Sequence, residues 1–244
     1  MARIFITGSA DGLGQLATKA LIAQGHQVVL HARNEKRGRE ALDKAPGAKA
    51  VVTADLSIIE ETLQLAEKVN ALGTFDAVIH NAGIYNAPAK ELFAVNTLAP
   101  YLLTCLMQKP KRLIYLSSDM HEGGRFKLDG IQTNIERITY SDTKLHVVML
   151  CKAVARKWPD VYANVLNPGW VPTKMGGAGA PDNLEKGFQT QVWLAVSNDE
   201  TAKVSGRFFY HKKEVRANPE ADDLQLQEKF LTVCHEFTGI SFPG

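Results

Sequence analysis

The chain has 244 residues, a formal net charge of +2 and three cysteines, Cys105, Cys151 and Cys234. So small a charge gives no electrostatic case for nucleic acid or an anionic membrane as a partner. The cysteines lie far apart without a Cys-x-x-Cys spacing, which argues against a metal site or a disulfide framework and favours a reducing compartment. Because no apolar run approaches the ~20 residues of a membrane span, and residues 1–25 lack a signal-peptide pattern, we expect a cytoplasmic protein.

Short apolar runs alternate with helical stretches through most of the chain. This alternation is typical of a parallel sheet with helices on both faces. No repeat or linker interrupts it, so we expect an α/β, doubly wound fold in a single domain over residues 1–244. The expected strands are 3–7, 27–32, 50–53, 75–80, 112–116 and 161–166, and the clearest helix is 12–24.

Two further segments have local signals. Ser57-Ile-Ile-Glu60 matches a capping box and predicts a helix that runs to about Asn70. Gly176-Gly-Ala-Gly-Ala-Pro181 is too short for a domain linker and suits a mobile loop. We expect residues 174–187 to form a lid over a substrate, with Met175 offering apolar surface.

The turn between the first strand and the first helix reads Thr7-Gly-Ser-Ala-Asp-Gly-Leu-Gly14. Its glycines would let a pyrophosphate approach the unpaired N–H groups of the helix N-terminus. A tight turn without a ligand is the alternative, but the position at the start of an alternating chain favours a dinucleotide. The cofactor-binding residues expected here are Gly8, Ser9, Ala10, Asp11, Gly12, Leu13 and Gly14.

The second strand is followed by Arg33 at the place where an NAD site offers a carboxylate to the ribose. A guanidinium can bind a 2′-phosphate through two hydrogen bonds. We therefore expect NADP(H) as the cofactor, with NAD less favoured. Lys36, Arg37 and Arg39 add positive charge nearby, and we interpret Arg37 and Arg39 as a solvated helix face.

Five motifs now stand in order along the chain: the Gly-rich turn, Asn81-Ala-Gly83, Ser118, Tyr140-x-x-x-Lys144 and Pro168-Gly169. Together they resemble the short-chain dehydrogenase/reductase superfamily over nearly the whole length. The resemblance implies a Rossmann-type sheet of about seven strands, the last near 207–210. It also implies further cofactor contacts, which are Asp55, Leu56, Asn81, Ala82, Gly83, Tyr140, Lys144, Pro168, Gly169, Val171 and Thr173.

The same resemblance assigns catalysis to Asn96, Ser118, Tyr140 and Lys144. A phenol and an ammonium four residues apart share one helical face. The pKa of a free phenol is about 10, and a nearby ammonium together with an oxidised nicotinamide would lower it, so Tyr140 is the expected proton donor. Ser118 would orient the substrate, with Ser117 as a structural neighbour. Asn96 would return protons through Lys144, although alone it reads equally well as a polar residue on a half-buried helix.

The separation of 22 positions from Ser118 to Tyr140, and the tail from Ser205 to Gly239, resemble the retinol dehydrogenase-like branch. Its members are typically NADP-linked and often act on lipophilic carbonyls or alcohols. The resemblance implies a small-molecule carbonyl or alcohol as substrate and a homodimer or homotetramer. We expect an NADP(H)-dependent oxidoreductase. A catalytically silent NADP(H)-sensing protein with the same fold is the alternative, and the four catalytic residues argue against it.

Overall fold

A single eight-stranded sheet forms the centre of the computed structural model, which describes residues 1–244 apart from the side chain of Gln132. The strand order is β3-β2-β1-β4-β5-β6-β7-β8. Ligands bind in such sheets where the order reverses, here between β1 and β4. The strands are β1 (Arg3–Ile6), β2 (Gln27–Ala32), β3 (Ala50–Thr53), β4 (Ala77–His80), β5 (Arg112–Leu116), β6 (Tyr162–Asn167), β7 (Phe208–Tyr210) and β8 (Lys213–Val215).

The α/β sheet expected from the sequence is confirmed, with one strand more than the seven that were expected. β1 to β7 pair in parallel, whereas β8 pairs antiparallel with β7. His211 and Lys212 form the connecting turn with φ of 47° and 63°. Two-residue hairpins need this left-handed backbone and usually contain glycine or asparagine. The hairpin was missed because neither residue gives that signal.

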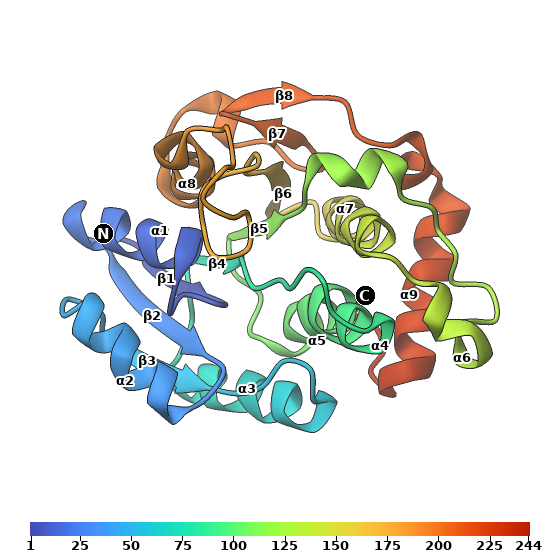
Figure 1. Cartoon of the computed structure of the whole chain (residues 1–244), viewed down its shortest axis with the longest axis horizontal. Helices are drawn as coiled ribbons and strands as arrows, with labels where there is room; N and C mark the ends of the chain where they lie inside the picture. The colour runs from blue at the N-terminus through green and yellow to red at the C-terminus, as the bar shows by residue number, and fades with distance from the viewer.

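Helices cover both faces of the sheet (Figure 1). Neighbouring strand residues point to opposite faces, so Ile4 and Ile6 pack into one apolar core and Phe5 into the other. In the described part of the chain, no helix has the length and apolar character to cross a membrane. One face carries α1 (Gly12–Ala23), α2 (Glu35–Lys44) and α8 (Leu184–Val196), and the other carries α3 (Ile59–Ala71), α5 (Ala99–Leu106), α7 (Tyr140–Lys157) and α9 (Leu224–Thr238).

Shorter helices join these layers, and they include the elements that surround the site. These are α4 (Ala89–Phe93), the π-helix η1 (Ala94–Leu98), α6 (Ile131–Asn134), and the 3₁₀ helices η2 (Asp119–Gly123), η3 (Ile135–Arg137), η4 (Glu200–Ala202) and η5 (Pro219–Asp222).

The capping box predicted at Ser57 is wrong. Helix α3 begins at Ile59 with Ile58 as its N-cap residue. The Ser57 hydroxyl instead donates to the Asp55 carboxylate at 2.7 Å. Asp55 also accepts the Ser57 N–H at 3.0 Å. Because the Ser57 side chain bonds to this nearby carboxylate, it does not cap the helix.

Candidate active site

A cavity of about 460 Å³ opens at the carboxyl ends of β1, β2 and β4. It extends from the Gly-rich turn to α7 and to the segment after β6. Most residues predicted from the sequence line it, so the fold brings segments more than 100 residues apart into one site. The predicted residues in its lining are Gly8, Ala10, Asp11, Gly12, Leu13, Arg33, Asp55, Leu56, Asn81, Ala82, Gly83, Tyr140, Lys144, Pro168 and Thr173.

Close contact with the end of β4 shapes the Gly-rich turn. Gly8 has a φ of 62°, and a Cβ there would lie 2.9 Å from the Cα of Ala82. A Cβ on Gly14 would lie 2.4 Å from Nδ2 of Asn81, whose amide donates to the carbonyls of Thr7 at 2.9 Å and Gly8 at 3.1 Å. Both positions therefore require glycine, and Asn81 holds the turn against the sheet.

His31 also fixes this turn, although no sequence motif indicated it. Its Nδ1 accepts the N–H of Gly8 at 3.0 Å and its Nε2 lies 3.0 Å from the carbonyl oxygen of Ala54. Nδ1 is therefore the unprotonated nitrogen. Burial lowers the pKa of His31 to about 4, so the ring stays neutral and keeps both bonds. Buried Ser9 donates to Ile6 and accepts the N–H of His31, which makes it a support of the turn.

Two basic residues after β2, Arg33 and Arg37, line the cavity. Nε of Arg33 donates to Asp55 at 2.7 Å, and the Arg33 side chain is 70% exposed. Burial raises the pKa of Asp55, but hydrogen bonds from Ser57 and Arg33 outweigh it, and the net shift is downward. Arg37 lines the cavity and contacts Asp11 at 3.2 Å. Our interpretation of Arg37 as part of a solvated face is therefore wrong, because the first turn of α2 directs it back over the Gly-rich turn.

Tyr140 and Lys144 lie together at the far wall of the cavity. Thr139 and Asp142 form a capping box, so α7 begins at Tyr140. The Lys144 ammonium is buried, donates to the Leu116 carbonyl at 3.0 Å and lies 5.4 Å from the centre of the Tyr140 ring. A Cβ on Gly83 would lie 3.2 Å from this ammonium, so glycine leaves the room that Lys144 occupies.

The protonation of this pair differs from the sequence-based expectation. Burial raises the pKa of Tyr140 to about 12; a hydrogen bond with Ser118 lowers it, and the charge of Asp119 raises it. The same burial lowers the pKa of Lys144 to about 8. Desolvation disfavours the charged form of each group and is the largest cause of both shifts. The phenol is thus held protonated at neutral pH.

The two serines after β5 have different contacts. The buried Ser117 hydroxyl donates to the backbone carbonyl of Lys144 at 2.8 Å, which is a structural bond between β5 and α7. Ser118 is half-buried, donates to the Asp119 carboxylate at 2.8 Å and lies near enough to Tyr140 to lower the pKa of the phenol. Ser118 is therefore the serine beside the phenol.

Asn96 lies in the π-helix η1, which interrupts the regular helix between α4 and α5. Its Oδ1 accepts the N–H of Ile84 at 2.9 Å, and its Nδ2 donates to the Ile84 carbonyl at 3.0 Å and to the Thr143 hydroxyl at 3.1 Å. Single-turn π-helices are often found at functional sites. The Asn96 amide therefore connects Ile84, in the segment after β4, to Thr143 of α7, the residue before Lys144.

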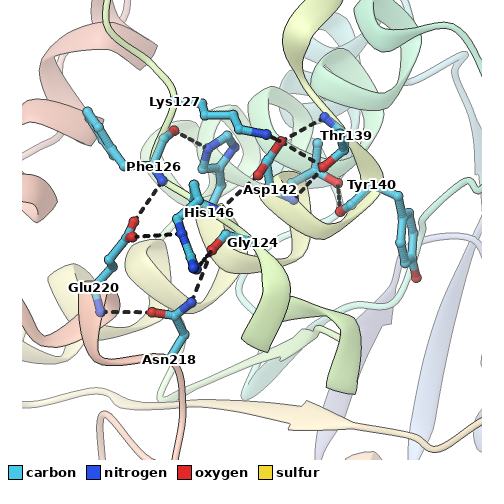
Figure 2. A network of polar contacts seen from close by, with 11 residues as sticks. Gly124, Phe126, Lys127, Thr139, Tyr140, Asp142, His146, Asn218 and Glu220 are labelled. Carbon is cyan, nitrogen blue, oxygen red and sulfur yellow. Dashed lines mark hydrogen bonds and ion pairs between the residues drawn. The ribbon is translucent and has the colours of Figure 1, made fainter.

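A polar network fixes α7 from the side away from the cavity (Figure 2). Buried Asp142 accepts the N–H of Arg125 at 2.8 Å and pairs with Lys127 at 3.2 Å. Nε2 of His146 lies 2.9 Å from the carbonyl oxygen of Phe126. In Figure 2 the Tyr140 ring points away from these contacts. The network therefore holds α7 in place without involving the Tyr140 phenol, which lines the cavity.

Other predicted residues support the site from outside the cavity lining. Val171 is buried, and its carbonyl accepts the N–H of Thr173 at 2.8 Å. Gly169 has a φ of 83° and donates to Asn167 at 2.9 Å. The predicted residues in this supporting group are Ser9, Gly14, Asn96, Ser118, Gly169 and Val171. Lining residues that the sequence did not indicate include Arg37, Lys174, Ile84, Glu91 and Val95.

Sequence comparison places this site among known proteins. Residues 2–112 match the family model described as short chain dehydrogenase. The chain is 49% identical to an uncharacterized oxidoreductase of Emericella nidulans and 41% identical to short-chain dehydrogenase chyC of Penicillium rubens, each over the full length of both proteins. It is 28% identical to retinol dehydrogenase 14 of Mus musculus, over 97% of this chain and 86% of that protein.

Solved structures have the same fold. A protein of Mycobacterium paratuberculosis superposes with a TM-score of 0.84 at 21% identity, covering 100% of this chain and 96% of the other. A short-chain dehydrogenase from Shigella flexneri, solved with NADP, gives a TM-score of 0.68 at 20% identity over 87% and 97% of the two chains. At these identities the comparison shows the fold alone.

Proposed function

Because the chain belongs to the short-chain dehydrogenase/reductase superfamily, in its retinol dehydrogenase-like branch, we propose that it is an NADP(H)-dependent enzyme interconverting a ketone or aldehyde with an alcohol. One observation carries the proposal. Tyr140, near Ser118 and with the Lys144 ammonium 5.4 Å from its ring centre, lies in the wall of the cavity that the Gly-rich turn also lines. A phenol held beside a dinucleotide site can supply the proton that carbonyl reduction requires.

The cavity fits a dinucleotide phosphate. Glycine at positions 8, 12 and 83 leaves backbone bare along the cavity wall, where side chains would intrude on a ligand. Arg33 and Arg37 approach the same end of the cavity, and their charges favour a 2′-phosphate over a bare ribose. The NADP bound in the Shigella flexneri structure supports this choice. When bound, the cofactor supplies the hydride or accepts it.

The protein's own groups handle the proton. With its pKa raised to about 12, Tyr140 carries its proton at neutral pH and can donate it to a carbonyl oxygen that accepts the hydride at carbon. Ser118, which lies near the phenol, would orient that oxygen. Asn96 reaches α7 through Thr143 and would keep the Lys144 ammonium in place. In the oxidation direction the same phenol must first lose its proton, so low pH favours reduction.

The mouth of the site offers apolar side chains to a substrate. Tyr85 is 43% exposed and its ring packs edge-on against Tyr140, with the ring centres 4.8 Å apart. Met120 and Met175 are also exposed, at 42% and 49%. The N–H of Met120 donates to the Ser118 hydroxyl at 3.2 Å, and Met175 lines the cavity. These contacts support a small, lipophilic carbonyl or alcohol as the substrate.

We further propose that the whole chain is one domain with a lid after Thr173. The expected end of the lid at residue 187 is too late, because α8 begins at Leu184 with Asn183 as its cap. A Cβ on Gly187 would lie 2.9 Å from Val171, so this part of α8 is packed in place. The movable part is then 174–183. A homodimer or homotetramer in the cytoplasm is the proposed context.

The test is a panel of ketones and aldehydes assayed by NADPH oxidation, with Tyr140→Phe as the variant and Tyr162→Phe, a tyrosine away from the cavity, as the matched control. Loss of one general acid lowers turnover by about 10²- to 10⁴-fold. We expect that loss in Tyr140→Phe alone, with NADPH still bound as measured by its fluorescence. An unaltered chain that binds NADPH and reduces no member of a broad panel would favour the sensing protein. Near-normal turnover in Tyr140→Phe would exclude Tyr140 as the acid.

A further inference from the structure

A carboxylate occupies the mouth of the proposed phosphate cradle. Asp11 is the N-cap of α1, and its Oδ1 accepts the N–H of Gly12 at 2.9 Å. This N–H is one of the groups that an anion at the helix N-terminus would use. A negative side chain at this place repels a phosphate unless cations compensate its charge.

Two cationic side chains from distant parts of the chain compensate the negative charge of Asp11. The other carboxylate oxygen, Oδ2, lies 3.2 Å from Nη2 of Arg37 and 3.0 Å from Nζ of Lys174. All three residues line the cavity. Arg37 comes from α2 on the 2′-phosphate side, whereas Lys174 comes from the segment after β6. Lys174 is the first residue of the proposed lid, but no sequence motif indicated a role for its ammonium.

The backbone at Lys174 is held directly over the helix N-terminus. The N–H of Gly177 donates to the Thr173 carbonyl at 2.8 Å, and the N–H of Gly176 donates to the Thr173 hydroxyl at 3.2 Å. A Cβ on Gly12 would lie 3.8 Å from the Thr173 methyl group, so this turn touches the start of α1. The Lys174 side chain is 82% exposed on a flexible stem, which leaves the ammonium able to turn from Asp11 to a neighbouring anion.

We propose that Lys174 binds the pyrophosphate of the cofactor and thereby fastens the base of the lid to the Gly-rich turn. The inference rests on the proposed dinucleotide function. A pyrophosphate at the N-terminus of α1 presents more negative charge than one carboxylate, and an ammonium serves it as a point charge. The ion pairs with Asp11 hold the Lys174 and Arg37 side chains at the edge of the cavity, close to where the phosphates of the cofactor would bind.

Three ligands distinguish binding of the pyrophosphate from binding of the 2′-phosphate. NADPH has both groups, ADP-ribose has the pyrophosphate without a 2′-phosphate, and adenosine 2′-monophosphate has the 2′-phosphate alone. Their dissociation constants are measured by calorimetry or by displacement of NADPH fluorescence. We expect Lys174→Gln to weaken NADPH and ADP-ribose about tenfold, as for one charged hydrogen bond, and to leave adenosine 2′-monophosphate unchanged. Lys174→Arg should restore most of the affinity, because it keeps the charge.

Lys44→Gln is the matched control, since it removes a positive charge from the exposed end of α2, outside the cavity lining. We expect it to change each constant less than twofold. Unchanged ADP-ribose affinity in Lys174→Gln, an effect on adenosine 2′-monophosphate alone, or an equal effect in Lys44→Gln would each overturn the inference. Failure of the unaltered chain to bind NADPH would instead refute the proposed function, so the two failures are distinguishable.

Discussion

Asn218 donates its backbone N–H to Nε2 of His121 at 3.2 Å, and so connects the segment before η5 to the loop that carries Ser118. Nδ1 of the same ring lies 2.6 Å from the carbonyl oxygen of Ser118 and must carry the proton. Burial lowers the pKa of His121, which keeps the ring neutral and both bonds intact. Residues near the C-terminus thus position Ser118 without touching the cavity.

Asn218→Ala tests this connection. The side-chain amide donates to the carbonyls of His121, Glu122 and Gly124, and its loss leaves these buried acceptors unpaired. We expect a loss of about 1–3 kcal/mol in the free energy of unfolding and a lower kcat with unchanged NADPH affinity. Chemical denaturation, steady-state kinetics and NADPH titration measure these effects. Asn134→Ala, at an exposed asparagine, is the control, and equal losses of NADPH affinity and kcat would contradict a positioning role.

Asp142→Asn tests the network behind α7. Burial raises the pKa of Asp142, but hydrogen bonds from Thr139, Arg125 and Lys127 bring it below its usual value. An amide in its place would turn an N–H group toward these donors, so we expect a loss of about 1–3 kcal/mol at pH 7.

The pH dependence of that loss follows from the sign of the shift. A carboxyl group with a depressed pKa in the folded state stabilises the fold above the unfolded value of about 4, and that stability disappears as pH falls through the lower folded value. The difference between the unaltered chain and Asp142→Asn should therefore shrink below pH ~4. Denaturation curves at several pH values, with exposed Asp43→Asn as the control, measure it. A difference that stays constant with pH would contradict a charge effect.

Arg33→Ala tests cofactor choice. Removal of the guanidinium deletes the proposed 2′-phosphate partner and also frees the Asp55 carboxylate, which is then able to face a ribose hydroxyl. We expect the ratio of kcat/KM for NADPH to that for NADH to fall by about tenfold or more. Arg39→Ala, exposed on α2 and outside the cavity lining, should leave the ratio unchanged. An unaltered ratio in Arg33→Ala would remove Arg33 from the 2′-phosphate site.

Gly14→Ala tests the close packing of the Gly-rich turn. The added methyl group would meet the Asn81 amide and the Gly8 carbonyl at 2.4 and 2.6 Å, so the turn must move away from β4. Overpacking of this kind costs about 1–3 kcal/mol, and we expect NADPH affinity to fall at least about tenfold with it. Gly123→Ala, where a Cβ meets nothing within 4 Å, is the control. Full NADPH affinity in Gly14→Ala would show that the turn tolerates the shift.

The sequence by itself determined the parts of this protein that local rules govern. Short apolar runs located six of the eight strands within two residues, and the family resemblance located a seventh, β7. The spacing from Tyr140 to Lys144 placed both groups on one helix face, and the glycines between β1 and α1 located a turn that lines the cavity. These features depend on backbone conformation and on neighbours a few residues away, which any single stretch of chain encodes.

Only the tertiary structure decided the contacts between distant segments. Asp11, Arg37 and Lys174 meet because β1, β2 and β6 end at the same edge of the sheet. The direction of the Tyr140 pKa shift likewise depends on burial, which no spacing in the sequence records. The fold sets how much solvent and which charges surround each group, and these quantities arise only when all the layers pack together.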